Sequence, residues 1–173
     1  MPSVYNAIPV KDITVHLHVE AYLKQWLEHS LGDPVRFPSR SYESCLLSRL
    51  VSTPPKAGLS ADGGDAGGVR IVLPDNALRP PEYYHYLSRR SSDTMRAAID
   101  ALFRLALWSE CAHLLGQKGN INKGIDRWCA GHGISIDYRE GVRQKFYRMR
   151  LQYRKRGIML GKMYEKKNGK TPS

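Results

Sequence analysis

The sequence contains few cysteines and no long apolar run. Its three cysteines, Cys45, Cys111 and Cys129, are odd in number and widely spaced, so we expect buried thiols and not a disulfide framework. No stretch approaches the roughly 20 apolar residues that a membrane-spanning helix needs, and the first residues lack the basic and apolar regions of a signal peptide. We therefore expect a cytoplasmic protein that does not contact a membrane.

Acidic residues are scarce in the last fifth of the chain. From Arg139 onward there are twelve lysines and arginines but only two acids, Glu140 and Glu165. The preceding 138 residues carry fifteen basic and fourteen acidic residues, so the last 35 residues hold +10 of the net charge of +11. Solubility alone does not require the charge to be sorted in this way. The distribution indicates a polyanionic partner, nucleic acid in the first place.

No constellation of residues typical of an enzyme stands out. The glycines of residues 63–68 do not match the phosphate-binding pattern Gly-x4-Gly-Lys-Ser/Thr. Two cysteines and two histidines have the right chemistry for zinc: Cys111, His113, Cys129 and His132. However, residues two apart on a helix point to different sides, and no Cys-x2-Cys pair is present. We expect no catalysis, no metal and no cofactor.

The N-terminal half is predicted to contain short strands and helices. Alternating β-branched residues predict a strand over 13–19, and apolar residues at helical spacing then predict a helix that closes at Gly32. A second short strand is expected over 35–37, followed by a helix with Ser41 as its N-cap. A third strand is expected over 69–73.

The C-terminal half is predicted to be helical. A helix is expected from Ser92 or Asp93 to about Leu115, and because it becomes apolar almost all round it should be a central core element. A shorter second helix is broken by Gly133. The third and last helix is expected to run from about residue 138 to 156.

The expected fold class is α+β. Residues 1–52 and 69–87 form a small N-terminal strand and helix region, and residues 53–68, rich in glycine and alanine, form a flexible loop within it. Residues 92–156 form a three-helix, helix-turn-helix-like unit, which residues 157–173 extend as a basic tail.

The last predicted helix combines an apolar stripe with an almost purely cationic face. Five residues share one narrow sector of the helix and are expected to pack on the two preceding helices: Tyr138, Val142, Phe146, Met149 and Tyr153. The residues expected to contact nucleic acid are Arg139, Arg143, Lys145, Tyr147, Arg148, Arg150, Arg154, Lys155 and Arg156. Like charges one turn apart cost a few tenths of a kcal/mol (roughly), and no acid within the helix body is expected to offset them. Phosphates would relieve this repulsion, because arginine forms bidentate bonds with their oxygens.

The order of core helix, short helix, glycine-containing turn and basic helix is that of a helix-turn-helix unit. Gly133 sits at the position of the turn glycine, Trp128 and Cys129 precede it at core positions, and Val142 falls at a later core position. The stretch from residue 120 to 156 therefore resembles helix-turn-helix DNA-binding proteins of bacterial phages and mobile elements.

This resemblance implies a non-catalytic DNA-binding protein with a regulatory or accessory role in a mobile element. Residues 138–145 would then approach base edges, and the basic residues from Arg148 to Arg156 would hold phosphates. Four lysines of the tail would add attraction that weakens with salt: Lys162, Lys166, Lys167 and Lys170. The N-terminal half would mediate dimerisation or partner contact, so a homodimer is possible.

Two other classes of function fit the same charge pattern. An RNA-binding protein is one, since arginine-rich helices with tyrosine also suit structured RNA. The other is a phage or structural interaction protein whose basic tail contacts nucleic acid or an acidic partner. Competition between duplex DNA and folded RNA would separate the first of these from a DNA-binding protein.

Overall fold

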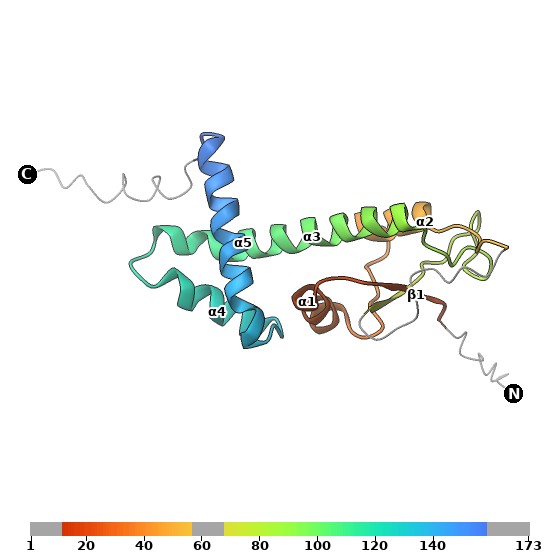
Figure 1. Cartoon of the computed structure of the whole chain (residues 1–173), viewed down its shortest axis with the longest axis horizontal. Helices are drawn as coiled ribbons and strands as arrows, with labels where there is room; N and C mark the ends of the chain where they lie inside the picture. The colour runs from red at the N-terminus through yellow and green to blue at the C-terminus, as the bar shows by residue number, and fades with distance from the viewer. Residues whose placement is uncertain (1–11, 57–67, 159–173) are drawn as a thin grey trace, which may run out of the picture. The chain divides into compact units, whose positions relative to one another are not determined.

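The computed structural model describes residues 12–56 and 68–158 of the chain. These residues form five α-helices, one 3-10 helix and a two-stranded sheet, which makes the protein α+β as predicted (Figure 1). In chain order the elements are β1 (Thr14–Leu17), α1 (Ala21–Leu31), α2 (Tyr42–Leu50), β2 (Val69–Val72), α3 (Arg89–Cys111), η1 (Ala112–Gly116), α4 (Ile121–Gly131) and α5 (Ile136–Lys155). None of the helices in the described ranges is both long and apolar enough to cross a membrane.

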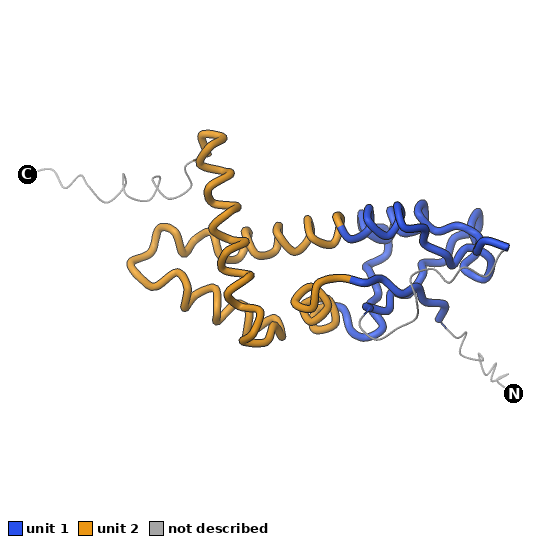
Figure 2. Tube along the Cα trace, viewed as in Figure 1, with its two compact units in different colours: residues 1–18, 31–96 blue, residues 19–30, 97–173 orange. Residues whose placement is uncertain are grey.

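The chain divides into two compact units (Figure 2). Unit 1 comprises residues 1–18 and 31–96, and unit 2 comprises residues 19–30 and 97–173. This division assigns nearly all of α1 to the helical unit, whereas the sequence analysis grouped that helix with the strands. Helix α3 contributes its first turns to unit 1 and the remainder to unit 2.

Unit 1 is built around the antiparallel pair β1 and β2. Leu17 lies opposite Val69 in this pair, and both side chains are buried because one face of the ribbon forms the core of the unit. The second strand expected over 35–37 is wrong. Only Val35 pairs, through an isolated parallel bridge to Ile71, because prolines on either side prevent a longer ladder.

Two helix starts, those of α2 and α3, depend on serine caps, of which the first was expected and the second was not. Ser41 caps α2 as predicted, since its hydroxyl accepts a hydrogen bond from the Ser44 N–H at 3.1 Å. The expected cap of α3 at Ser92 or Asp93 is wrong, because α3 begins at Arg89 and Ser92 is buried inside it. The hydroxyl of Ser88 instead accepts from the Ser91 N–H at 3.2 Å.

The core of unit 2 is centred on Phe103 of α3. Its side chain is fully buried and makes edge-to-face contacts with Tyr22, Trp26 and Trp128, whose ring centroids lie 5.2, 5.2 and 5.7 Å away. One ring therefore joins α1, α3 and α4. The indole of Trp128 also donates a hydrogen bond of 2.9 Å to Glu110, which ties α4 to the end of α3.

Helix α5 crosses the C-terminal half of α3 (Figure 1) and buries most of the predicted apolar stripe. Val142, Phe146 and Met149 are buried, and Trp108 of α3 packs against both Phe146 and Tyr153. The expected packing of Tyr138 is wrong: its side chain is 38% exposed. Tyr138 lies at the edge of the apolar sector and in the first turn of α5, which begins two residues earlier than expected.

The central position of Phe103 predicts a large loss of stability in the variant Phe103→Ala. Removing a fully buried phenylalanine should lower the free energy of unfolding by roughly 3–5 kcal/mol. Leu105→Ala on the same helix is the control and should change it by less than about 0.5 kcal/mol, since that side chain is 65% exposed. All three tryptophans belong to unit 2, so their fluorescence during urea unfolding measures this difference. Equal losses in the two variants would contradict the assignment of Phe103 as the centre of this core.

Candidate nucleic-acid interface

The turn that joins α4 to α5 spans residues 132–135 and is fixed by α1. Gly133 has a φ of +74°, a backbone conformation that residues other than glycine rarely adopt. A Cβ atom at Gly133 would also lie 2.9 Å from the side chain of His29. The N–H of Ser135 donates a 2.9 Å hydrogen bond to the side chain of Gln25. The predicted turn glycine is therefore required both by the backbone and by its neighbour.

The side of α5 that faces α4 carries a bidentate ion pair. The Arg143 guanidinium donates to both carboxylate oxygens of Asp126, with 2.8 Å between Nε and Oδ1, and also to Glu140 at 2.9 Å. Both side chains of the Arg143–Asp126 pair are only 27% exposed. The expectation that no acid offsets the arginines of this helix is thus wrong for Arg143, which two carboxylates neutralise.

The Arg143–Asp126 pair also changes how the carboxyl group of Asp126 titrates. The hydrogen bond from Arg143 lowers the pKa of Asp126 below its ordinary value, and the charges of Arg143 and Arg139 lower it further, against the opposing effect of partial burial. Asp126 therefore stays ionised, and its ion pair with Arg143 persists, to a lower pH than for an aspartate without such a partner.

Lys145 is held on the opposite flank of α5. Its ammonium group is paired with Asp100 of α3 and lies 5.2 Å from the ring centroid of Tyr22 and 5.8 Å from that of Phe103. Its side chain is 21% exposed. Lys145 is therefore an anchor between α5 and the core of unit 2, and contributes little to an external cationic surface.

Two more of the predicted contact residues also face α4. The hydroxyl of Tyr147 donates a 2.8 Å hydrogen bond to the side chain of Asn122, although 37% of the residue remains exposed. Arg139 is half-buried, and its Nε has no hydrogen-bond partner among the described residues. These residues belong to the contact between the helices more than to a free surface.

The second half of α5 differs from the first in that its cations have no partners. Among the residues that the structure describes, five make no ion pair or side-chain hydrogen bond: Arg148, Arg150, Arg154, Lys155 and Arg156. All of them are exposed except Arg150, which is half-buried. We call this set the free cationic segment.

The position at which α4 begins explains why these cations have no partners. Asp126 lies level with Arg143, and Asn122 lies level with Tyr147, so the two helices run in opposite directions. The part of α5 beyond Tyr147 therefore extends past Ile121, the first residue of α4. It lies level with the loop that precedes α4, which contains Lys118 and no acid. No carboxylate of α4 is therefore placed to neutralise the last two turns of α5.

The beginning of α5 has a different character. Ile136 is 73% exposed, and the exposed side chains of Asp137 and Glu140 lie in the first two turns. Carboxylates at the start of a helix interact favourably with the positive end of the helix dipole, but they repel phosphates. The residues of 138–145, which the sequence analysis assigned to base edges, thus lie in a segment with exposed acids, and two of its cations, Arg143 and Lys145, are already paired with carboxylates of other helices.

Three further cations escaped the sequence analysis. Lys118, Lys123 and Arg127 are exposed and make no ion pair with any described residue. The spacing of four between Lys123 and Arg127 places both on one face of α4, which was the available signal.

Two of the four residues weighed as zinc ligands, Cys111 and Cys129, are buried close enough for Cys129 to raise the pKa of Cys111. Burial raises the pKa of the Cys111 thiol to about 12 and that of Cys129 to about 11, so both remain protonated. The Nδ1–H of His132 donates a 2.8 Å hydrogen bond to the carbonyl of Trp128, and its ring stacks on the indole of Trp128. Its Nε2 lies 3.4 Å from Glu110, and His113 is exposed. Within the described ranges no three histidine, cysteine or acidic side chains are grouped as a metal site.

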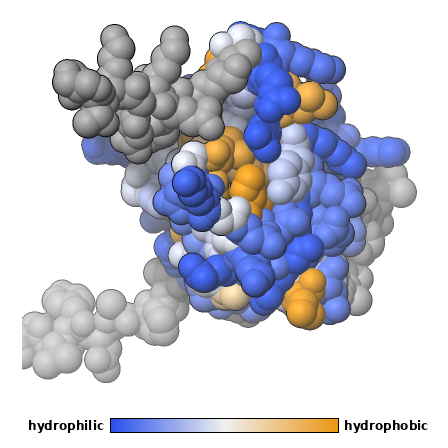
Figure 3. Space-filling view, turned by 90° about the vertical axis from the view of Figure 1, so that its left-hand side faces the viewer, coloured by the Kyte–Doolittle hydropathy of each residue, from blue (hydrophilic) through white to orange (hydrophobic). Residues whose placement is uncertain are grey.

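The face of the molecule seen in Figure 3 is mostly hydrophilic, with an apolar area near its centre and smaller ones toward its right-hand edge. The tail lysines Lys162, Lys166, Lys167 and Lys170 lie outside the described residues.

No family model, curated protein or solved structure shows significant similarity to this chain.

The ion pair between Arg143 and Asp126 predicts a stability that depends on pH. Because the pKa of Asp126 is lowered in the folded protein, its contribution is complete above the ordinary value of about 4 and is lost as the pH falls through the folded value. Asp126→Asn should therefore lower the urea midpoint at pH 7, and the difference from the wild type should shrink steadily below pH 4 (roughly). Tryptophan fluorescence measures both proteins.

Glu82→Gln is the matched control for this pH dependence. It removes the same charge from an exposed residue without an ion pair in the described part of the chain. Because Glu82 lies in unit 1 and the three tryptophans lie in unit 2, this control is followed by far-UV circular dichroism, and its urea midpoint should match that of the wild type at every pH. A destabilisation by Asp126→Asn that stays constant down to pH 2 (roughly) would show that the ion pair is not responsible.

Proposed function

We propose that this protein binds nucleic acid without catalysis, through phosphates held by the free cationic segment of α5. The observation that supports this most directly is the contrast within one helix. Arg143 and Lys145 form ion pairs with carboxylates of unit 2. The five cations of the free cationic segment, which follows them along the chain, form none with the described residues. Unpaired arginines in this density are suited to bidentate bonds with phosphate oxygens.

The length of the free cationic segment suits a phosphate backbone. From Arg148 to Arg156 the helix advances about 12 Å at 1.5 Å per residue. One strand of a duplex presents a phosphate every 3.4 Å or so of axial rise, so the segment spans about three or four phosphates. Lys123 and Arg127 on α4 are available for contacts beside these.

Duplex DNA is the partner that we propose, with recognition dominated by the backbone and not by base edges. Acids in the first two turns of α5 disfavour insertion of that end into a groove lined by phosphates. The hydroxyl of Tyr147 is already bonded to Asn122, which reduces its value for stacking on an unpaired base of RNA. The regulatory or accessory role in a mobile element and the homodimer stay predictions.

The triple variant Arg148→Gln, Arg154→Gln, Arg156→Gln tests the proposal. Its affinity for a duplex of mixed sequence should fall roughly tenfold or more at low salt. Each lost phosphate contact should reduce the slope of log K against log salt by about 0.9, so the triple variant should lose a slope of roughly 2 to 3. Fluorescence anisotropy over a salt series measures both quantities.

A second triple variant with the same change of charge serves as the control. Arg49, Arg89 and Arg90 are exposed and their guanidinium groups have no partner among the described residues, so their replacement by glutamine should leave the slope nearly unchanged. Equal losses in the two triple variants would mean that only net charge matters. If the wild type bound neither duplex DNA nor hairpin RNA at low salt, the basic segment would have to be assigned to an acidic protein partner.

A further inference from the structure

An apolar side chain lies exposed among the residues of the free cationic segment. Leu151 of α5 is 51% exposed, whereas Val142, Phe146 and Met149 of the same helix are buried. Figure 1 shows that the last turns of α5 extend beyond the place where this helix crosses α3. A partner that binds the free cationic segment would therefore meet Leu151 as well.

Helix geometry places two free cations on each side of Leu151. Successive residues of an α-helix are about 100° apart around its axis, so Arg148 and Lys155 lie about 60° and 40° to one side of Leu151. Arg154 and Arg150 lie about 60° and 100° to the other side. None of the four cations makes an ion pair or a side-chain hydrogen bond with a described residue. The second half of α5 thus presents an apolar side chain between two rows of positive charge.

This arrangement matches the major groove of duplex DNA. That groove is roughly 12 Å wide and admits an α-helix, and a phosphate backbone runs along each of its edges. The C5-methyl group of thymine lies in the major groove, where it contacts apolar side chains. The major groove of duplex RNA is deep and too narrow for side chains to read. A single strand has only one backbone and would leave one of the two rows without phosphates.

The first turns of α5 do not share this arrangement. Ile136 is 73% exposed and is therefore as accessible as Leu151. However, Asp137 follows it directly, and Glu140 lies about one turn further along the helix. Both acids are exposed and would repel a phosphate backbone. Ile136 is thus a matched control for Leu151 on the same helix.

We propose that the second half of α5 lies in the major groove of duplex DNA and that Leu151 contacts the methyl groups of thymine. Arg148 and Lys155 bind phosphates of one strand, and Arg150 and Arg154 bind phosphates of the other. This inference rests on the proposed function and deepens it, because it names the groove and a base contact. The phosphates still supply most of the affinity, and Leu151 adds a preference for sites with A·T pairs.

Replacement of thymine by deoxyuridine tests the methyl contact. Two duplexes of one sequence, made only of A·T or A·U pairs, differ in the C5-methyl groups of the major groove. The wild type should bind the thymine duplex about fourfold more tightly, as expected for the burial of one methyl group. Leu151→Ala should bind the two duplexes equally, whereas Ile136→Ala should keep the ratio of the wild type. Fluorescence anisotropy measures the affinities, and far-UV circular dichroism checks that both variants are folded.

Either of two results would overturn the contact of Leu151 with thymine. One is equal affinity of the wild type for the two duplexes, and the other is a ratio that Leu151→Ala leaves unchanged. In both cases a normal dependence on salt would leave the proposed phosphate binding intact. If the wild type showed no salt-dependent binding to either duplex, the proposed function and this inference would both be wrong.

Two double variants with the same change of charge test the two rows of cations. Arg148→Gln with Lys155→Gln removes one row, and Arg150→Gln with Arg154→Gln removes the other. Each double variant should reduce the slope of log K against log salt by about 1.8 on duplex DNA, because two phosphate contacts are lost. A loss confined to one of the double variants would mean that α5 contacts the backbone through a single row, and the assignment to the major groove would be wrong.

Discussion

The burial of Val142, Phe146 and Met149 fixes how α5 is rotated about its axis, and the rest of the surface depends on that rotation. An α-helix turns about 100° per residue, so an apolar stripe that is fixed in the core fixes the direction of every other side chain. Arg143 and Tyr147 must then face α4, whereas Lys145 must face α3 and α1. A rotation by one residue would bury cations and expose Phe146.

Within this constraint, the positions of three acidic side chains decide which cations remain free. Asp126 and Glu140 neutralise Arg143, and Asp100 neutralises Lys145. All three lie level with the first half of α5, so the second half is left without carboxylates in the described part of the chain. The division of α5 into an anchoring half and a cationic half is therefore a consequence of where α4 and α3 carry their acids.

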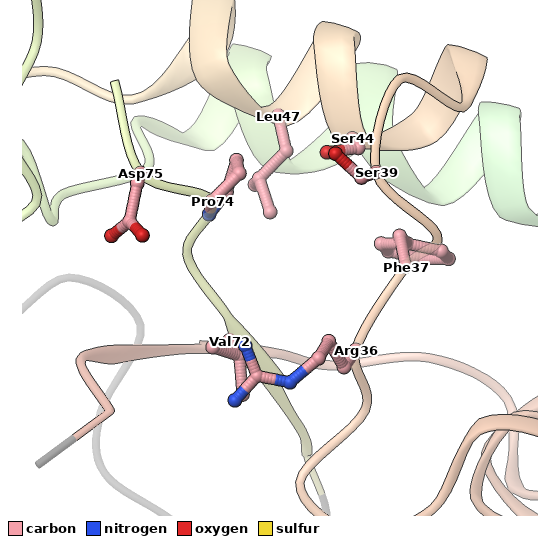
Figure 4. A pocket seen from close by; sticks show the side chains of 8 residues that line it. All are labelled: Arg36, Phe37, Ser39, Ser44, Leu47, Val72, Pro74 and Asp75. Atoms are coloured by element: carbon pink, nitrogen blue, oxygen red, sulfur yellow. The ribbon is translucent and has the colours of Figure 1, made fainter. Parts of the chain in front are cut away.

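The sequence predicted the buried stripe of α5 well because periodicity is a local property. It could not predict the pairing of Arg143 with Asp126 or of Lys145 with Asp100, because these partners lie 17 and 45 residues away on other helices. The second partner of Arg143, Glu140, is only three residues away on the same helix, and this pairing could have been predicted. The missing strand at 35–37 has a local cause instead, since Pro34 and Pro38 limit the pairing to the single bridge between Val35 and Ile71. A hollow of unit 1 lined by Phe37, Leu47 and Val72 (Figure 4) combines residues from three segments, which no pattern in the sequence connects.

The cationic end of α5 is compatible with a stable helix even without a bound polyanion. Arg154 and Lys155 lie in the last turn, where a cation gains roughly 0.3–1 kcal/mol from the helix dipole. The repulsion between Arg150 and Arg154, four residues apart, costs only about 0.2–0.5 kcal/mol. The two effects nearly cancel or favour the helix, so stability measurements cannot reveal why the cations are there. Only the response of binding to salt separates a phosphate-binding surface from a solvated basic helix end, because counterion release depends on the number of phosphates that are contacted.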